Sequence, residues 1–362
     1  MKTIKDIYDS KKNFFTILEI MLSILIIYYH TYPIFYGDNR FSDVFTRFLK
    51  VNLGGVIVAM FFTISGFFII DSLKKSKNIG EYLKKRIKKI YPPLIFFLLV
   101  FSLLIAPIVS DIDKFCFIVH SEYYMNYITS NLLFFQNNSY AIYSVFENLP
   151  YKSAISGSLW TIKHTIYTYL FAIPINRYLL NDKKNKKINK FNIFMVLLFI
   201  VALLGETTIL NGAYEKIAAW NPNFSLFVEF KMFIKLLFFF CAGIFININK
   251  DKIKVNKYIV FALLALVVCG AIISKNHYLM YLVLPYLTIV VGCIKCPIRI
   301  NPYSYHIYIG GFAVQQLLMY YTYPNISFAV FVILSIILSV VYGVISYYLT
   351  ENIIRKKKVS WN

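Results

Sequence analysis

Long apolar stretches recur along the whole chain and leave few folds open to it. The first, Phe14–Phe35, matches the roughly 20 residues that a helix needs to cross a bilayer. Nine more follow: Leu53–Leu73, Pro92–Val109, Leu159–Leu179, Phe191–Leu210, Met232–Ile248, Tyr258–Ser274, Tyr278–Ile294, Tyr303–Tyr321 and Phe328–Leu349. Because helices satisfy their own backbone polar groups in lipid, the pattern predicts an all-α, polytopic membrane protein with about ten transmembrane helices.

The composition agrees with this architecture. Of 362 residues, 59% are hydrophobic and 15% are charged, which is too apolar for a soluble domain with one core. No small-residue cleavage pattern follows the first stretch, so we expect it to remain as a transmembrane helix. We expect one membrane domain over residues 1–362, with a short basic cytoplasmic tail at 351–362.

The basic residues give an independent test of the order of the spans. With a cytoplasmic N-terminus, 28 of the 38 Lys and Arg residues fall in cytoplasmic segments and seven in outer segments. This alternation follows the positive-inside rule and predicts that both termini are cytoplasmic. The net charge of +21 is thus divided among alternate loops, which disfavours a nucleic-acid partner. Cys293 and Cys296 lack the second pair of a structural zinc site, so we expect no metal.

Two segments outside the spans have distinctive compositions. The cytoplasmic segment Lys74–Pro93 predicts a short basic amphipathic helix that ends at Pro92-Pro93 and has an apolar side containing Ile87. It either anchors the membrane surface or clamps the phosphates of a nucleotide-like donor. The longest outer segment, Ser110–Ser156, is rich in Tyr and Asn. It suits a sugar-binding or lid surface, and interfacial packing of tyrosines is the equal alternative.

Polar groups recur inside several spans and suggest a shared interior site. His30 lies in the first span, about 24 Å along a helix that rises about 1.5 Å per residue, and therefore near the outer face. Ionisable side chains at membrane depth usually serve a function. A second polar break runs from Thr63 to Phe68, and a third from Gly157 to His164.

Five motifs in this order resemble the acyltransferase-3 family of bacterial membrane acyltransferases. They are His30; Leu53–Val56 running into Phe61–Phe67 (FFTISGF); the basic run Tyr82–Pro92 (YLKKRIKKIYP); Gly157–Lys163 (GSLWTIK); and Ser304–Ile309 (SYHIYI) followed by Val314–Gln316. Each motif alone is weak, whereas the ordered series covers most of the chain. The resemblance implies a multi-pass protein of the bacterial cytoplasmic membrane.

The resemblance also implies an activity. Members move an acyl group, commonly acetyl from acetyl-CoA, onto hydroxyls of extracytoplasmic glycans or lipid-linked saccharides, so acyl-CoA is a donor substrate and no cofactor is bound permanently. By this resemblance His30 is the general base, and Arg86 belongs to the donor-binding motif, to which we assign Lys85, Lys89 and Ser65 as well. The oxyanion needs preorganised donors, and the candidates are Lys163, Trp160 and Ser158.

The sequence departs from the family pattern at three positions. Glu19 stands where an arginine is usual, Thr165 where a glutamate is usual, and Gly311 where many members have a second histidine. A transporter or flippase of a lipid-linked saccharide is the alternative function, and a glycan polymerase or ligase is the third. Matching broken helices in two halves would favour transport, and the sequence does not have that pairing.

Other polar residues are given weaker roles. His164 is predicted to pack against a tyrosine hydroxyl and His306 to be structural. Ser65-Gly66 is predicted to permit close helix approach. Gln315 and Gln316 either bind substrate or tie helices together.

Overall fold

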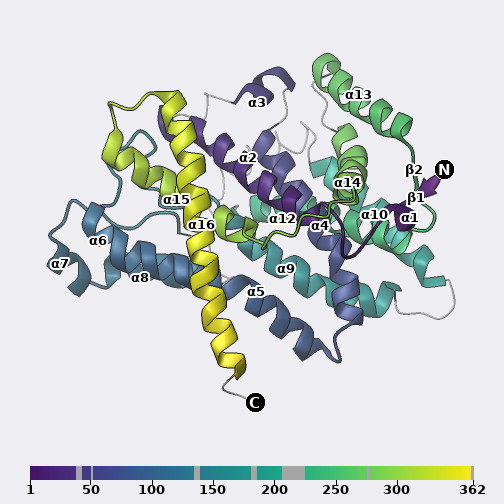
Figure 1. Cartoon of the computed structure of the whole chain (residues 1–362), viewed down its shortest axis with the longest axis horizontal. Coiled ribbons are helices and arrows are strands. Elements are labelled where there is room, and N and C mark those ends of the chain that lie inside the picture. Colours follow the sequence, from purple (N-terminus) through teal and green to yellow (C-terminus); the bar gives the residue numbers. More distant parts are fainter. Residues whose placement is uncertain are drawn as a thin grey trace. The chain divides into compact units, whose positions relative to one another are not determined.

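A computed structural model describes residues 1–37, 43–49, 52–133, 139–180, 186–205, 225–274 and 278–359 (Figure 1). Most of these residues are helical, so the predicted helical character is confirmed. The chain forms two compact units. Unit 1 comprises Met1–Phe15, Phe48–Tyr82 and His164–Ile298; unit 2 comprises Thr16–Arg47, Leu83–Lys163 and Arg299–Asn362.

The described elements are mostly helices, and a long segment that the structure describes in part lies between α8 and α9. In chain order they are β1 Lys2–Thr3, α1 Ile4–Ile7, α2 Phe15–Tyr36, α3 Val44–Leu49, α4 Leu53–Lys74, α5 Ile79–Leu99, η1 Val100–Ile105, α6 Ala106–Val109, α7 Lys114–Val119, α8 Glu122–Leu132, α9 Trp160–Pro174, η2 Ile175–Leu180, α10 Lys186–Gly205, α12 Ser225–Ile248, β2 Lys254–Val255, α13 Lys257–Ser274, α14 Tyr278–Gly292, α15 Ser304–Thr322 and α16 Phe328–Val359. Both η elements are π-helical.

Five helical stretches are long and apolar enough to cross a bilayer: Phe15–Tyr36, Leu53–Lys74, Ile79–Val109, Glu229–Ile248 and Phe328–Glu351. Three shorter apolar helices, Lys190–Leu204, Lys257–Cys269 and Met280–Gly292, coincide with further predicted spans. The remaining two predicted spans correspond to α9 and α15, which carry more polar residues. Such a set of helices is typical of a multi-pass membrane protein. A total of ten spans stays a prediction, and residues 206–210 of the fifth lie outside the described part.

In unit 1, α4 and α12 pack at very short range through glycines. A Cβ atom on Gly66 would collide with the backbone carbonyl of Phe240, and one on Gly243 would collide with the backbone of Thr63. Asn247 Nδ2 also donates to the backbone carbonyl of Phe67 at 2.8 Å. The prediction that Ser65-Gly66 permits close helix approach is therefore confirmed.

The N-terminal segment joins two other segments that are predicted to be cytoplasmic. β1 pairs antiparallel with β2, so that Lys2 lies opposite Val255. The backbone N–H of Phe14 donates to the backbone carbonyl of Gly292 at 2.9 Å. Backbone hydrogen bonds of this kind require all three segments to be on the same side of the membrane, as the charge pattern predicts.

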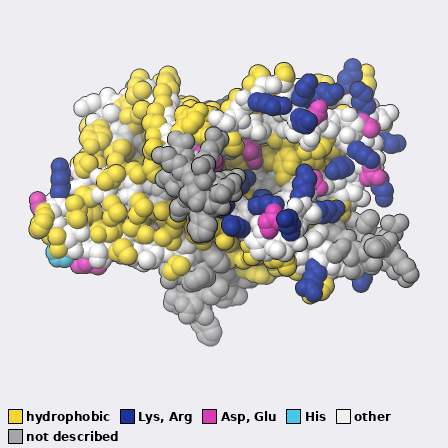
Figure 2. Space-filling view, turned by 60° about the horizontal axis from the view of Figure 1, so that its bottom comes forward, with side chains coloured by type: hydrophobic (Ala, Val, Ile, Leu, Met, Phe, Trp, Pro, Cys, Tyr) yellow, Lys and Arg dark blue, Asp and Glu magenta, His cyan; other side chains and the backbone are white. Residues whose placement is uncertain are grey.

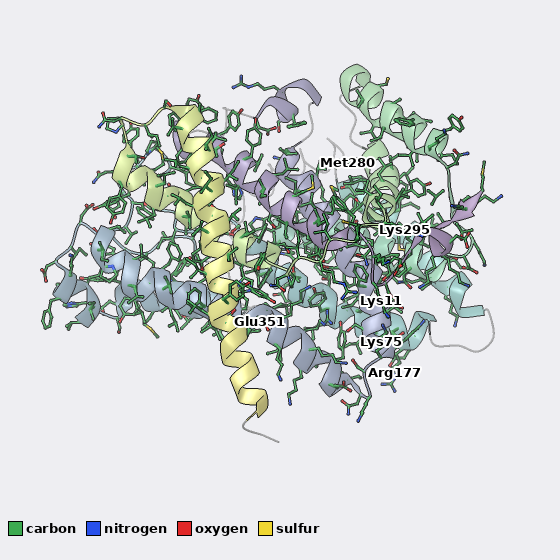
Figure 3. All side chains as sticks on the ribbon, in the orientation of Figure 1. Lys11, Lys75, Arg177, Met280, Lys295 and Glu351 are labelled. Carbon is green, nitrogen blue, oxygen red and sulfur yellow. The ribbon has the colours of Figure 1, made fainter. Side chains whose placement is uncertain are left out.

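Basic side chains also gather in groups. On the face in Figure 2, Lys and Arg side chains (dark blue) form groups that are separate from broad hydrophobic areas (yellow). Within unit 1, Figure 3 shows Lys11, Lys75 and Arg177 toward the same end. These residues come from three segments that are predicted to be cytoplasmic, so their grouping agrees with the positive-inside assignment.

Unit 2 is organised around α15 and α16. A Cβ atom on Gly310 would collide with the ring of Tyr342, and one on Gly343 would collide with Ile307. His306 Nδ1 shares a 2.9 Å hydrogen bond with Ser346 Oγ, so the structural role predicted for His306 is confirmed. α16 continues to Val359 and makes most of the predicted tail helical; residues 360–362 lie outside the described part.

The prediction that Pro92-Pro93 ends the basic helix is wrong. Both prolines lie inside α5, which continues through η1 and α6 to Val109. Proline provides no N–H for the carbonyl four residues earlier, but buried helices tolerate this loss when neighbouring groups satisfy the backbone. Tyr305 Oη of α15 donates to the backbone carbonyl of Ile90, just before the prolines, at 3.3 Å and ties this part of α5 to α15. The basic stretch and the following span are therefore one continuous helical element.

Candidate active site

His30 lies near the C-terminal end of α2, in unit 2. Its side chain is half-buried, and its ring packs edge-on against Phe312 of α15, with 5.2 Å between ring centroids. Tyr29 is its other ring neighbour, at 5.5 Å. No residue in the described part of the chain hydrogen bonds to the His30 imidazole. Packing against the two rings therefore holds the imidazole.

Backbone and amide contacts fix α2 against α15 beside this histidine. Ser23 Oγ donates to the backbone carbonyl of Ser304 at 2.9 Å, and Gln315 Nε2 donates to that of Ile27 at 3.0 Å. Gly311 also lies against Ile27, and a Cβ atom there would be 2.9 Å from Ile27 Cγ1. A larger side chain at position 311 would have to displace Ile27. Gly311, which stands where many family members have a histidine, therefore allows α15 to pack closely against Ile27 of α2.

The outer segment reaches the same helix. Gln316 Nε2 donates to the backbone carbonyls of Tyr151 and Ala154, each at 2.8 Å. The Tyr151 ring packs edge-on against Phe312 at 5.6 Å. Phe312 thus contacts both His30 and the outer segment. The sequence predicts that Gln315 and Gln316 either bind substrate or tie helices together. These hydrogen bonds confirm that both side chains link separate elements.

A cluster of hydroxyl groups lies one helical turn from Phe312, around Tyr308 of α15. Tyr308 Oη and Thr161 Oγ1 are 2.9 Å apart, and Tyr308 Oη donates to the backbone carbonyl of Ser158 at 3.3 Å. Ser158 Oγ in turn donates to the backbone carbonyl of Tyr308 at 3.3 Å, and lies 3.3 Å from Ser156 Oγ. Sequence reasoning missed Tyr308 and Thr161. The available signal was the four-residue spacing that puts Tyr308 and Phe312 on one face of a helix.

The other two predicted oxyanion donors lie at the start of α9. Trp160, half-buried, is the first residue of the helix, and Lys163, only 6% exposed, follows one turn later. Positions three apart lie on the same side of a helix. Both residues belong to unit 2, as do His30 and Ser158.

The basic stretch occupies the first turns of α5. Lys85 and Lys89 are exposed and Arg86 is half-buried, while Ile90 is buried. Tyr82 and Ile90, which the amphipathic pattern also puts on the apolar side, are buried, whereas Ile87 is 55% exposed. The assignment of Ile87 to the apolar side stays a prediction. The helix continues beyond Pro93 into the following span.

Glu19 lies on α2, eleven residues before His30. Lys89 of α5 acts electrostatically on its carboxyl group. The position where the family pattern has a basic residue thus has an acidic residue here, and a basic residue comes from the neighbouring helix.

Ser65 is the one predicted site residue that belongs wholly to unit 1. It is half-buried on α4, beside the close contact between Gly66 and Phe240 of α12. This location accounts for a small residue by packing alone. Its predicted part in donor binding remains a prediction.

His164 has a carboxylate partner that the sequence did not indicate. Its Nε2 lies 3.5 Å from Glu229 Oε2 of α12, also in unit 1. The His164 side chain is 1% exposed and lies near the rings of Tyr167 and Phe233, both at 6.3 Å. The predicted neighbour, a tyrosine, is present as a ring contact, and the ionisable partner is Glu229.

Unit 2 contains the residue types that proton transfer from a hydroxyl group needs. A histidine in its neutral form can accept such a proton. Hydroxyl, indole and ammonium groups, as in Ser158, Trp160 and Lys163, are the kinds of donor that stabilise an oxyanion.

Comparisons with known proteins identify the family. The sequence model of the acyltransferase-3 family, described as an acyltransferase domain, matches residues 12–348. A protein of Shigella phage Sf6 named O-acetyl transferase is 22% identical over 318 residues, which cover 85% of this chain and 86% of that protein. No solved structure matches the chain. Because the family model covers nearly the whole sequence, the chain belongs to the acyltransferase-3 family, and the protein is an acyltransferase.

Proposed function

We propose that this enzyme moves an acetyl group from cytosolic acetyl-CoA to a hydroxyl of an extracytoplasmic glycan or lipid-linked saccharide. The reaction would take place in the cytoplasmic membrane of a bacterium. The observation that carries the proposal is the His30 imidazole, which is packed by Phe312 beside the outer segment and has no hydrogen bond within the described residues. The name of the Shigella phage Sf6 relative supports acetyl as the group transferred.

In the proposed reaction, His30 takes the proton of the acceptor hydroxyl as its oxygen attacks the thioester carbonyl. The tetrahedral intermediate then releases the thiolate of coenzyme A, which receives the proton from His30. An ester forms, a thioester breaks, and no net proton is consumed. General-base assistance of this kind typically contributes about 10²- to 10⁴-fold in rate.

Donors for the oxyanion come from the start of α9 in this proposal. Ser158 Oγ donates to the backbone carbonyl of Tyr308, so it would have to release this hydrogen bond to serve the oxyanion. Lys163 and Trp160 are candidates beside it. The Tyr308 and Thr161 hydroxyls, 2.9 Å apart, would hold the start of α9 against α15.

The donor would bind through its phosphates to Arg86, Lys85 and Lys89. Arginine offers a two-pronged donor for phosphate, and lysine a point charge. Tyr305 binds the backbone of Ile90 at the end of this stretch, and Phe312 lies seven residues later on α15, about 10 Å along the helix. We propose that the extended phosphopantetheine arm covers this distance, which needs no covalent acyl-enzyme intermediate.

Mass spectrometry of surface glycans tests the proposal. Cells with the gene should carry glycans heavier by one acetyl group per modified site than cells without it. Membranes supplied with acetyl-CoA labelled in the acetyl group should place the label on the glycan. A flippase would change the amount of exported saccharide and leave its mass unchanged, and that result would contradict the proposal.

A further inference from the structure

Three aromatic rings form a stack on the outer segment of unit 2. The rings of His120 and Tyr123 are 5.4 Å apart at an interplanar angle of 21°, and those of Tyr123 and Tyr143 are 4.9 Å apart at 22°. Tyr143 is 61% exposed and His120 is also exposed. Tyr123 is half-buried between them. Since Tyr123 covers one face of Tyr143, the opposite face of that ring is left for a ligand.

The surrounding backbone holds Tyr143 in place. Its N–H donates to the backbone carbonyl of Tyr123 at 3.4 Å, and the N–H of Asp111 donates to that of Ser144 at 3.1 Å. Ser144 and Phe146 have φ angles of 58° and 61°. This left-handed conformation is unfavourable for a residue with a large side chain, and it tends to persist where a structure enforces it for function.

Polar residues flank the stack in sequence. Glu122, next to Tyr123, is exposed, and so are Glu147 and Asn148, four and five residues after Tyr143. Asn148 Nδ2 donates to Asp111 Oδ2 at 3.4 Å, so one of its hydrogens is engaged there. An exposed flat ring in a segment with exposed carboxylate and amide groups matches a pyranose, which has an apolar C–H face and hydroxyl groups around its edge.

Helix α7, which precedes His120 in the same segment, has an exposed apolar side that can be compared with the stack. Phe115, Ile118 and Val119 are 77%, 54% and 58% exposed, and their spacing puts them on one side of the helix. None of the three has a polar group. The stack differs from this surface because each of its rings has a polar atom and charged neighbours.

We propose that the stack of His120, Tyr123 and Tyr143 binds the saccharide acceptor, with a sugar ring against the exposed face of Tyr143. This inference rests on the proposed function, because it supplies the acceptor site of the same reaction. The acceptor would be held by its ring and hydroxyl groups at the outer segment. The contact of Tyr151 with Phe312 joins this segment to the His30 site.

Substitutions in the intact membrane-embedded enzyme test it. The probe is a set of fragments of the host's surface polysaccharide from which O-linked acyl groups have been removed. Tyr143→Ala should raise the apparent KM for these fragments about tenfold, as expected for losing an aromatic contact, and leave the KM for acetyl-CoA within twofold. Tyr143→Phe keeps the ring and should stay within threefold of the wild type. Phe115→Ala, at an equally exposed aromatic residue, is the matched control and should change neither constant.

Direct binding separates this inference from the proposed function. The purified full-length protein should bind immobilised deacylated polysaccharide, and Tyr143→Ala should bind about tenfold more weakly. If transfer fails but this binding depends on Tyr143, the acceptor site stands and the proposed reaction falls. Equal binding by the wild type and Tyr143→Ala would overturn the acceptor site. Strong quenching of a Tyr143→Trp fluorophore by brominated lipids would also overturn it, in favour of lipid contact.

Discussion

Two histidines in predicted spans, His30 and His164, have opposite surroundings. His30 is half-buried on α2, packs against the rings of Tyr29 and Phe312, and has no hydrogen-bond partner in the described residues. His164 is fully buried on α9, and its Nε2 lies 3.5 Å from the Glu229 carboxylate. A ring nitrogen that already faces a carboxylate is oriented by the protein, whereas an unused nitrogen can serve a substrate. The difference teaches that two ionisable side chains in predicted spans can be held in different ways, and it motivates the proposal that His30 is the one that serves the substrate.

The largest effect that follows from this comparison is on His30. His30→Gln should insert and fold normally but lose acyl transfer by at least about 10²-fold, because glutamine retains hydrogen bonding and cannot act as a base. The measurement is acetyl transfer in membranes with matched protein abundance, beside a thermal-stability assay. Transfer at the wild-type rate would remove His30 from the mechanism and direct attention to Lys163 and His164.

A smaller effect is expected at the donor side. Arg86→Ala should raise the apparent KM for acetyl-CoA about tenfold, with little change for the acceptor, because the two-pronged contact with phosphate is lost. Arg86→Lys should recover only part of it, since an ammonium group cannot form the same fork. An unchanged donor KM in a normally inserted Arg86→Ala protein would return this stretch to lipid anchoring.

The next effect in size, below that of Arg86→Ala, is expected at the hydroxyl cluster around Tyr308. Tyr308→Phe removes the hydroxyl that contacts Thr161 and Ser158, and we expect about 1 kcal/mol of lost stability. Transfer should fall only severalfold, because Tyr308 positions α9 and does not itself accept the proton. Thr161→Val, which breaks the same contact from the other side, should have a similar effect. A loss as large as that of His30→Gln would mean that Tyr308 takes part in the chemistry.

The smallest effect on transfer is expected at His164. His164→Gln should leave the rate within a few fold while lowering stability by about 1 kcal/mol, because Glu229 is partly exposed and the pair is only moderately strong. Glu229→Gln should have a similar effect, and the double variant should lose less than the sum of both. A rate loss of 10²-fold in His164→Gln with stability intact would reverse the roles of the two histidines.

Much of the fold is predictable because apolar length and loop charge are properties of the local sequence. Eight predicted spans coincide with apolar helices, and the contacts of the N-terminal segment agree with its assigned side. The path of α5 was not predictable in this way. Pro92-Pro93 indicates a break locally, whereas the helix continues through both prolines and is tied to α15 by the hydrogen bond from Tyr305 to Ile90.

The site was predictable only in part. His30 and Ser158 could be found as polar residues in apolar spans, but their partners depend on which helices meet. Glu229 is 65 residues from His164 in sequence, and Tyr308 is 147 residues from Thr161. The packing of Gly311 against Ile27 likewise comes from tertiary contact. The sequence has no local signal for pairs of this kind.

The most direct test of the central claim, that His30 accepts the proton of the acceptor, is the pH dependence of transfer. The wild-type rate should fall as the pH is lowered, because a protonated imidazole cannot act as a base. The residual rate of His30→Gln, measured with the same membranes and substrates, should lack this fall. The same acid-side fall in both proteins would show that another group accepts the proton and would contradict the account.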